Sequence, residues 1–182
     1  SLRYNVVRED RTAADSLLGR ALGEKLARTL DRLYRLLGLL YDWKDISAAR
    51  WSLEQGDARM KASAAEYLDT LLDGAIRRHV MPILEDLPIE EKVRRGNSLL
   101  KTRVRDAEDS LAQLIHDDDQ VVAATAIQFV ERRGIWSLAD DLEYALAHRS
   151  ASDWYVFEAA SWALAARRLS PEERQRRWLE PL

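Results

Sequence analysis

The residues best suited to chemistry are a histidine followed by three aspartates, His116-Asp117-Asp118-Asp119. Imidazole and carboxylate groups bind divalent metals and transfer protons. Adjacent side chains point in different directions, however, so the four cannot all ligate one ion, and the spacing of an EF-hand loop is absent. A solvated turn whose last aspartate caps the next helix explains the same residues. We therefore expect a turn here and not a metal or acid–base site.

The other two histidines offer no better site. His79 and His148 have no cysteine nearby, because the chain contains none, and they lack an HExxH-type partner. We expect both on the surface or at helix ends. Phosphate-binding glycine loops, GxSxG and zinc signatures are also missing from the sequence. The sequence thus predicts no catalytic residue, no cofactor and no metal.

Pairs of adjacent arginines are the second candidate. They are Arg77-Arg78, Arg94-Arg95, Arg132-Arg133, Arg167-Arg168 and Arg176-Arg177. Several lie near expected helix ends, where positive charge interacts favourably with the helix dipole. Stacked helices could also align them into a basic ridge for an acidic protein, phosphate groups or nucleic acid. Interleaved acids and the net charge of −3 oppose nucleic-acid binding, so none is expected.

Tryptophan is the third candidate, with six in the chain. Trp51, Trp136 and Trp162 lie on apolar faces and are predicted to fill the core. The other three, Trp43, Trp154 and Trp178, flank helix ends, where an amphipathic ring is expected to be half exposed. Exposed tryptophans would favour a protein-binding groove. The predicted interaction surface combines one of them with two arginine pairs: Arg132, Arg133, Trp154, Arg167 and Arg168.

The elements that carry these residues are predicted to be helices throughout. Of the 182 residues, 47% are hydrophobic and 32% charged, which is typical of a soluble globular protein. Residues 1–11 read as a lead-in segment packed on the first long helix. Residues 12–40 form that helix, because leucines recur every three or four positions. Residues 45–179 are predicted to form helical hairpins, within a single domain of residues 1–182.

Polar residues and glycines predict where these helices begin and end. Asp45 and Asp57 are expected to cap helices. Gly56 and Gly74 are expected to end the preceding helices in the left-handed conformation. Ser98 is predicted to cap a helix that runs from Leu99 to Ile115. Near the end of the chain, Ser170, Pro171 and Glu173 form a capping-box signature.

A weak repeat connects three of the junctions. Counted from Asp57, Asp119 and Asp153, positions +5 and +7 are mostly alanine and position +11 is aliphatic. Asp153 follows Asp119 by 34 positions, whereas Asp119 follows Asp57 by 62. Helical hairpins that recur at roughly 30–45 residues are typical of α-solenoids. The predicted fold is therefore an all-α, HEAT-like solenoid of stacked antiparallel helix pairs; an irregular helical bundle is the alternative.

Four segments carry a family resemblance: residues 36–45 (LLGLLYDWKD), 55–64 (QGDARMKASA), 66–72 (EYLDTLL) and 82–86 (PILED). They resemble HEAT-repeat regions that follow the membrane part of some bacterial transporters, related to the nucleotide (ATP/ADP) translocases and the major-facilitator type. The resemblance implies a cytoplasmic domain tethered at the inner face of a membrane. Its partner would be another protein or the membrane part of the same longer chain. It assigns no transport residue here.

Two further observations bear on function. No run of about 18 apolar residues occurs, so no membrane span is expected in this segment. The chain starts with Ser1 and not methionine, which suggests either an excised piece of a longer protein or a processed or tagged chain. We therefore expect a non-catalytic protein-interaction or regulatory module of a transporter-like protein. The alternatives are a HEAT-fold nucleic-acid-binding protein, such as a DNA glycosylase of that fold, and a free-standing scaffold.

Overall fold

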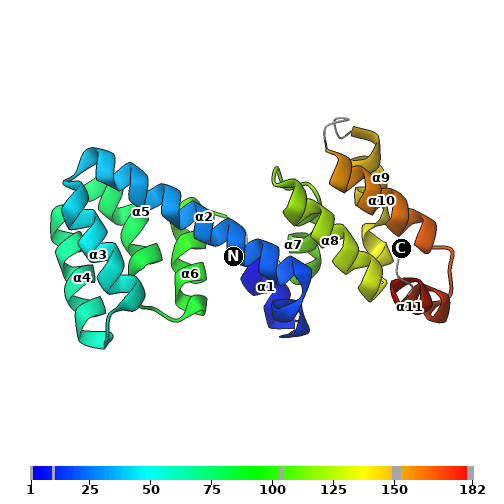
Figure 1. Ribbon diagram of the computed structural model, residues 1–182, viewed down its shortest axis with the longest axis horizontal. Helices are drawn as coiled ribbons and strands as arrows, with labels where there is room; N and C mark the ends of the chain where they lie inside the picture. Colours follow the sequence, from blue (N-terminus) through cyan, green and yellow to red (C-terminus); the bar gives the residue numbers. More distant parts are fainter. Residues whose placement is uncertain (1, 10, 103–104, 149–152, 180–182) are drawn as a thin grey trace. The chain divides into compact units, whose positions relative to one another are not determined.

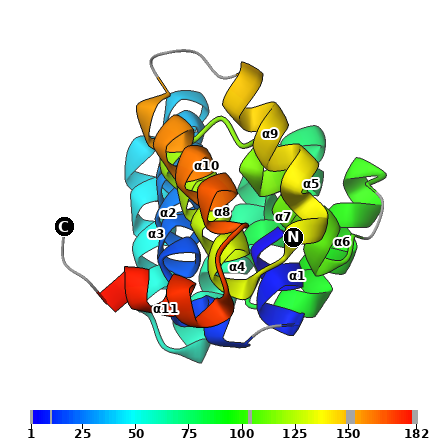
Figure 2. The ribbon, with the colours of Figure 1, turned by 90° about the vertical axis from the view of Figure 1, so that its right-hand side faces the viewer.

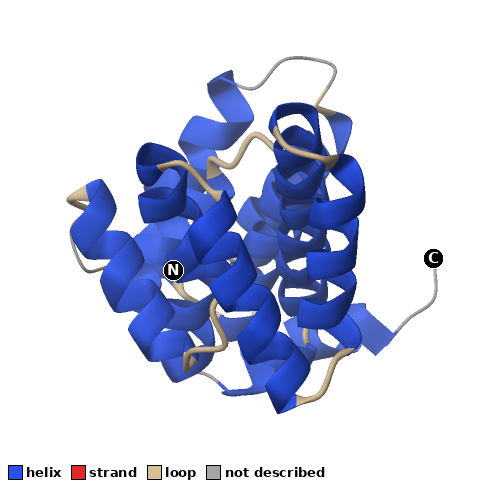
Figure 3. Ribbon diagram, turned by 90° about the vertical axis from the view of Figure 1, so that its left-hand side faces the viewer, coloured by secondary structure: helices blue, strands red, loops and turns tan. Residues whose placement is uncertain are grey.

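The computed structural model describes residues 2–9, 11–102, 105–148 and 153–179. Within these ranges every regular element is a helix and no strand occurs, which confirms the all-α class (Figure 3). The elements, labelled in Figure 1, are α1 (Leu2–Glu9), η1 (Arg11–Asp15), α2 (Leu17–Leu40), α3 (Trp43–Gln55), α4 (Ala58–Leu71), α5 (Gly74–Leu84), α6 (Ile89–Leu100), α7 (Ala107–Ile115), α8 (Gln120–Arg133), η2 (Trp136–Leu138), α9 (Ala139–His148), α10 (Trp154–Ala166) and α11 (Pro171–Leu179).

The chain divides into two compact units. Unit 1 comprises residues 26–104, and unit 2 comprises residues 2–25 together with 105–182. The division passes through α2, whose first turns pack in unit 2. Each unit buries its own hydrophobic cluster. Two separate sets of apolar side chains therefore leave water when the chain folds.

The core of unit 2 is built around α8. This helix packs against α7 and α10, and α10 also packs against α9 (Figure 2). Seven residues of α8 are buried, among them Ile127 and Val130, which are fully covered. Asp119 caps the helix, as predicted, by accepting hydrogen bonds from the backbone N–H groups of Val121 and Val122. Gly134 ends it in the left-handed conformation (φ 65°).

The lead-in segment packs differently from the prediction. Residues 2–9 form α1, whose principal neighbour is α7 and not the long helix. Val6 is buried in the core of unit 2, and the Asn5 side-chain amide donates a buried hydrogen bond of 3.0 Å to the Ser110 hydroxyl. The predicted helix 12–40 begins as the 3₁₀ helix η1, and α2 starts at Leu17. The partner of α1 lies 105 positions away in sequence, which periodicity alone cannot reveal.

Unit 1 is a succession of neighbouring helices. α3 packs on α4, α4 on α5, and α5 on α6. Its core includes Ile46 and Leu68, both almost fully buried. The Tyr41 hydroxyl joins the α2–α3 corner to the start of α5, since it donates to the Asp73 carboxylate and accepts from the Asp73 backbone N–H. No residue of α6 is buried. Partly exposed side chains therefore make the contacts between α6 and α5.

The caps of unit 1 confirm one prediction and correct another. Asp57 caps α4, as expected, through the Met60 N–H at 2.8 Å. The cap of α3 is Asp42 and not Asp45, which lies in the first turn of that helix. Asp42 accepts from the Lys44 N–H at 2.8 Å. The helix therefore begins earlier than expected, at Trp43.

Two glycines also behave differently from the prediction. Gly56 is extended (φ −72°, ψ 160°) and not left-handed. What requires a glycine there is close approach: a Cβ would lie 2.4 Å from the Ser52 carbonyl oxygen and 2.7 Å from the Met60 Cβ. Gly74 does not end α4, because Leu72 already occupies that cap and Gly74 is the first residue of α5.

The helix predicted from Leu99 to Ile115 is wrong. Ser98 lies inside α6, which runs through Gly96 and ends at Leu100. Lys101 then takes the left-handed C-cap conformation (φ 51°), a position where glycine is usual, so no sequence signal marked the break. α7 begins only at Ala107, capped by Asp106 through the Asp109 N–H.

Candidate interaction surface

The predicted interaction residues lie on, or directly after, two helices of unit 2 that pack side by side. α8 ends in Arg132 and Arg133, and α10 runs from Trp154 to Ala166, followed by Arg167 and Arg168. The two helices run in the same direction (Figures 1 and 2). The structure therefore gathers both arginine pairs at one end of this helix pair. It does not bring Trp154 to them, because α10 separates it by 13 residues, or about 20 Å at 1.5 Å per residue.

The four arginines are exposed. Arg133 donates to the Thr12 hydroxyl and lies over the Phe129 ring, 5.5 Å from its centroid. Arg167 lies 3.9 Å from a Glu143 carboxylate oxygen. Their position at helix C-termini favours positive charge by itself. A local helix-end role therefore explains part of this cluster.

The tryptophans contradict the core prediction at two positions. Trp51 is 57% exposed and Trp162 is 41% exposed, so neither fills the core. Trp136 is half-buried and carries the Arg174 guanidinium 5.2 Å from its ring centroid. Trp43 and Trp154 are well exposed, as expected for helix-end positions, and the Trp178 side chain lies outside the described residues.

Four exposed aromatic side chains of unit 2 belong to α10. Trp154 is 61% exposed, Tyr155 62% and Phe157 47%, and the Trp154 and Phe157 rings stack with centroids 6.1 Å apart. Together with Trp162 they form what we call the α10 face: Trp154, Tyr155, Phe157 and Trp162. Sequence reasoning singled out only Trp154, because Phe157 and Trp162 share a periodic apolar pattern with the buried residues of the same helix.

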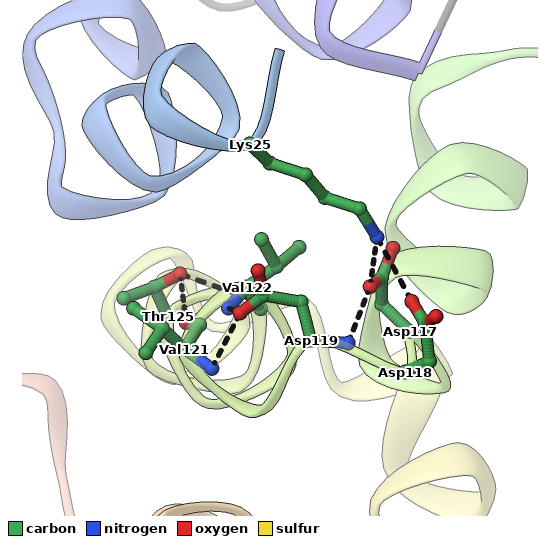
Figure 4. A network of polar contacts seen from close by, with 7 residues as sticks. All are labelled: Lys25, Asp117, Asp118, Asp119, Val121, Val122 and Thr125. Carbon is green, nitrogen blue, oxygen red and sulfur yellow. Dashed lines mark hydrogen bonds and ion pairs between the residues drawn. The ribbon is translucent and has the colours of Figure 1, made fainter. Parts of the chain in front are cut away.

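The His116–Asp119 turn is a structural junction (Figure 4). Lys25 forms ion pairs with Asp117 and, at 3.0 Å, with Asp118. The Asp117 carboxylate also accepts the Asp119 N–H at 2.8 Å, while Asp119 caps α8. His116 contacts Asp141 at 2.9 Å through Nε2. The carboxylates thus serve a cap and an ion pair that hold α2 to the α7–α8 turn.

Electrostatics at this turn agree with that role. Partial burial alone would lower the pKa of Lys25, but hydrogen bonds to Asp117 and Asp118 outweigh it and raise that pKa. The hydrogen bond from Lys25 is the main cause of the lowered pKa of Asp118. Both groups are therefore charged across the neutral range. A catalytic acid or base would instead need a pKa near the working pH.

Among the described residues, no three His, Asp or Glu side chains converge closely enough to hold a metal. His79 and His148 each contact a backbone carbonyl one turn earlier in their own helix. A shallow groove between α3 and α4 is lined mostly by small side chains, with Asp45 and Arg59 as its charged residues.

Comparison with known proteins adds no relative. No family model, no curated protein and no solved structure matches this chain. In the described part of the chain, no helix combines the length and the apolar character needed to cross a membrane.

Proposed function

We propose that this chain is a non-catalytic protein-interaction or regulatory module. The observation that carries the proposal is the α10 face, four large aromatic side chains that one helix leaves exposed. Tryptophan and tyrosine are enriched among the residues that contribute most to protein–protein affinity. Each supplies a large apolar area at a low cost in side-chain entropy. A partner that covers this face would remove that area from water.

We further propose that the helices form a HEAT-like α-solenoid. Three features support it: α8 packs against both α7 and α10, α10 packs against α9, and aspartates occupy the N-cap positions of α4, α8 and α10. Solenoids present extended surfaces built from successive helices, which suits a binding role. The α8–α10 layer is then the binding side.

The proposed setting is the cytoplasmic side of a transporter-like membrane protein. This rests on the resemblance of residues 35–87 to HEAT-repeat regions of bacterial nucleotide-translocase-like transporters. Sequencing the gene upstream of residue 1 tests it. Membrane-spanning helices encoded there support the proposal, and a gene without them leaves a free-standing scaffold.

Photo-cross-linking tests the binding role. Phe157→benzoylphenylalanine is introduced into the full-length protein in cells, and cross-linked proteins are identified by mass spectrometry. The control places the same group at Gln113, an exposed position on α7. We expect a defined protein adduct from position 157 and none from position 113. Equal, unspecific yields from both positions would contradict the proposal.

A second candidate, nucleic-acid binding, is favoured by one observation, the two arginine pairs at the same end of α8 and α10. Phosphate contacts release counterions, so such binding weakens steeply with salt. A DNA-binding titration between 50 and 200 mM salt, on the chain and on an Arg132→Ala, Arg168→Ala variant, tests it. Salt-dependent binding that the variant weakens supports this candidate, and absence of binding removes it.

A further inference from the structure

We propose that the end of α2 and the start of α3 dock on the surface of an anionic lipid bilayer. The surface concerned, which we call the α2 tip, consists of four exposed apolar residues: Leu36, Leu39, Leu40 and Trp43. It belongs to unit 1, whereas the α10 face belongs to unit 2, so the inference goes beyond the proposed function.

The three leucines of the α2 tip form an apolar surface that points away from the core. Among the described large apolar residues, Leu39 is the most exposed, at 82%, and Leu36 and Leu40 are each more than half exposed. Their spacing places them within an arc of about 100° on one helix side, as wide as the stripe that normally faces a core. The core of unit 1 is contacted by the other side of α2, through Tyr34 and Leu37. Single exposed leucines are ordinary, but a contiguous patch marks a binding surface.

Trp43 extends this surface across a helix corner. α2 ends at Leu40 and α3 begins at Trp43, so only two residues join the helices (Figure 1). A Cβ at Gly38 would lie 3.9 Å from the Cα of Trp43, which places the start of α3 against the last turn of α2. The groove of unit 1 between α3 and α4 is lined by other residues. The α2 tip is therefore the outside of a corner and not a groove.

Arginines continue the same side of α2 towards its N-terminus. Arg32 precedes Leu36 by four positions, and Arg35 precedes Leu39 by four, so each arginine lies one turn from a leucine. Both arginines are exposed. A guanidinium can donate two parallel hydrogen bonds to a phosphate group. This side of the helix therefore offers an apolar end followed by a phosphate-binding turn.

The charge of this part of α2 is complementary to an anionic surface. Residues 26–40 contain three arginines and one aspartate, Asp31, which gives a net charge of 3 − 1 = +2. Asp31 pairs with Arg35 and with Arg50 of α3, each at 2.8 Å. Arg50 also pairs with Glu54 at 2.9 Å, so α3 supplies one charge of each sign and leaves this balance unchanged.

Three aspartates near the corner already have partners in the fold. Asp42 caps α3, and Asp73 accepts a hydrogen bond from the Tyr41 hydroxyl. Asp45 lines the α3–α4 groove, where its hydrogen bond with Tyr67 raises the pKa of that tyrosine. These contacts hold the corner in one conformation, so that little ordering is needed when it docks.

Composition favours a bilayer over a protein as the occupant. Leucine is under-represented among the residues that contribute most to protein–protein affinity, and such residues lie in pockets. Leucine and tryptophan combined with arginine are typical of helices that lie at a membrane surface. One helical turn, about 5.4 Å, separates each leucine from the arginine before it. The leucines can therefore enter the acyl boundary, about 5–10 Å deep, while the arginines stay at the phosphates.

Vesicle co-sedimentation of the full chain tests the proposal. The probes are phosphatidylcholine vesicles, and the same vesicles with phosphatidylglycerol added as the anionic lipid. A single myristoyl chain gives a partition constant of about 10⁴ M⁻¹, so we expect on the order of 10³–10⁴ M⁻¹ for the anionic vesicles and at least about tenfold less for the neutral ones. Between about 50 and 200 mM salt the binding should weaken, because salt screens the arginines.

Single substitutions test the residues. Leu39→Ser should lower the partition constant about tenfold. Leu100→Ser is the matched control, because Leu100 is an exposed leucine of unit 1 on α6, and it should have no effect. Arg32→Ala should lower the constant about fivefold at low salt. Arg59→Ala removes an equal charge from the exposed surface of α4 and should not. Circular dichroism confirms that each variant is folded.

A fluorescent label tests which part of the chain enters the bilayer, since the chain has no cysteine of its own. Leu39→Cys, labelled with a polarity-sensitive fluorophore, should shift its emission to shorter wavelength on anionic vesicles. The same label on Leu100→Cys should not. Equal shifts at both positions would mean unspecific adsorption and would overturn the proposal.

The remaining outcomes separate a lipid surface from a protein partner. Absence of binding to anionic vesicles, or binding that Leu39→Ser leaves intact, overturns the proposal. A benzoylphenylalanine at position 39 that cross-links one defined protein in cells, without vesicle binding, would assign the α2 tip to that protein. None of these results decides the role of the α10 face, which the cross-link at position 157 tests separately.

Discussion

At the residue scale, the polar side chains of this chain act mainly as caps and ion pairs. The capping box predicted at the start of α11 is present: the Ser170 N–H donates to Glu173, and the Glu173 N–H donates back to the Ser170 hydroxyl. Such motifs are readable from sequence because both partners are three residues apart. Lys25 and Asp117 are 92 positions apart, so their pairing is not readable in this way.

Glu91 is the residue whose titration gives the sharpest prediction. Hydrogen bonds from Arg94 and Arg95 lower its pKa from an ordinary 4.5 to about 2. Because the pKa is lower in the folded chain, the Glu91 contribution to stability is present above about pH 4.5 and disappears as the pH falls through 2. Glu91→Gln should lower the melting temperature at pH 7, and this deficit should become small at pH 2, where about half of the Glu91 side chains are already protonated.

Glu90→Gln is the control for that prediction, because Glu90 lies in the same first turn of α6. Thermal melts of both variants and the parent chain between pH 7 and pH 2 provide the measurement. A melting-temperature deficit of Glu91→Gln that persists unchanged at pH 2 would show that the arginine pairs do not carry the effect.

At the element scale, helix existence was predictable and helix boundaries were less so. Local signals gave Asp57 and Asp119 as caps, because a side chain and a backbone N–H two or three residues apart form the motif. The break after Leu100 was missed because Lys101, a residue without turn preference, adopts the left-handed conformation. The exposure of Trp51 and Trp162 was missed because periodicity identifies an apolar side and not whether anything covers it.

Replacing Gly56 or Gly23 by alanine tests whether close packing or backbone entropy decides how a glycine affects the stability of the chain. A Cβ at Gly56 would overlap the Ser52 carbonyl oxygen and the Met60 Cβ, whereas a Cβ at Gly23, inside α2, meets nothing within 4 Å. Gly56→Ala should therefore destabilise the chain by about 1–3 kcal/mol. Gly23→Ala should stabilise it by about 0.5–1 kcal/mol, because alanine loses less backbone entropy in a helix.

Urea denaturation of the two glycine variants measures both changes. Opposite signs are the expected result. If both variants were stabilised, the α3–α4 junction would have to relax around the new methyl group, and the close approach at Gly56 would not be the reason for its glycine.

At the scale of the whole molecule, the division into two units follows from contacts between distant segments. Unit 2 joins residues 2–25 to residues 105–182, and its buried Asn5–Ser110 hydrogen bond spans 105 positions. Sequence periodicity carries no information about such pairings. It predicted the helical class, but neither the partner of α1, nor the passage of the unit boundary through α2, nor which apolar side chains are covered.

The helices differ in how many buried residues they contain, and this difference predicts which helix unfolds locally first. α8 has seven buried residues and α6 has none. Local opening needs least free energy where few apolar contacts hold an element. Backbone amides of α6 should therefore exchange with deuterium roughly 100-fold or more faster than those of α8 around Ile127 and Val130, when both are corrected for intrinsic rates.

The Ile127→Ala variant separates local opening from unfolding of a whole unit. It should cost about 2–5 kcal/mol, because Ile127 is fully buried and its truncation leaves a cavity. The amide exchange rates in α8 should rise in proportion to this loss of stability. The rates in α6 should change little, because α6 already exchanges through local opening. The same acceleration in α6 and α8 would mean that α6 exchanges only when unit 2 unfolds, and protection would then not follow local burial.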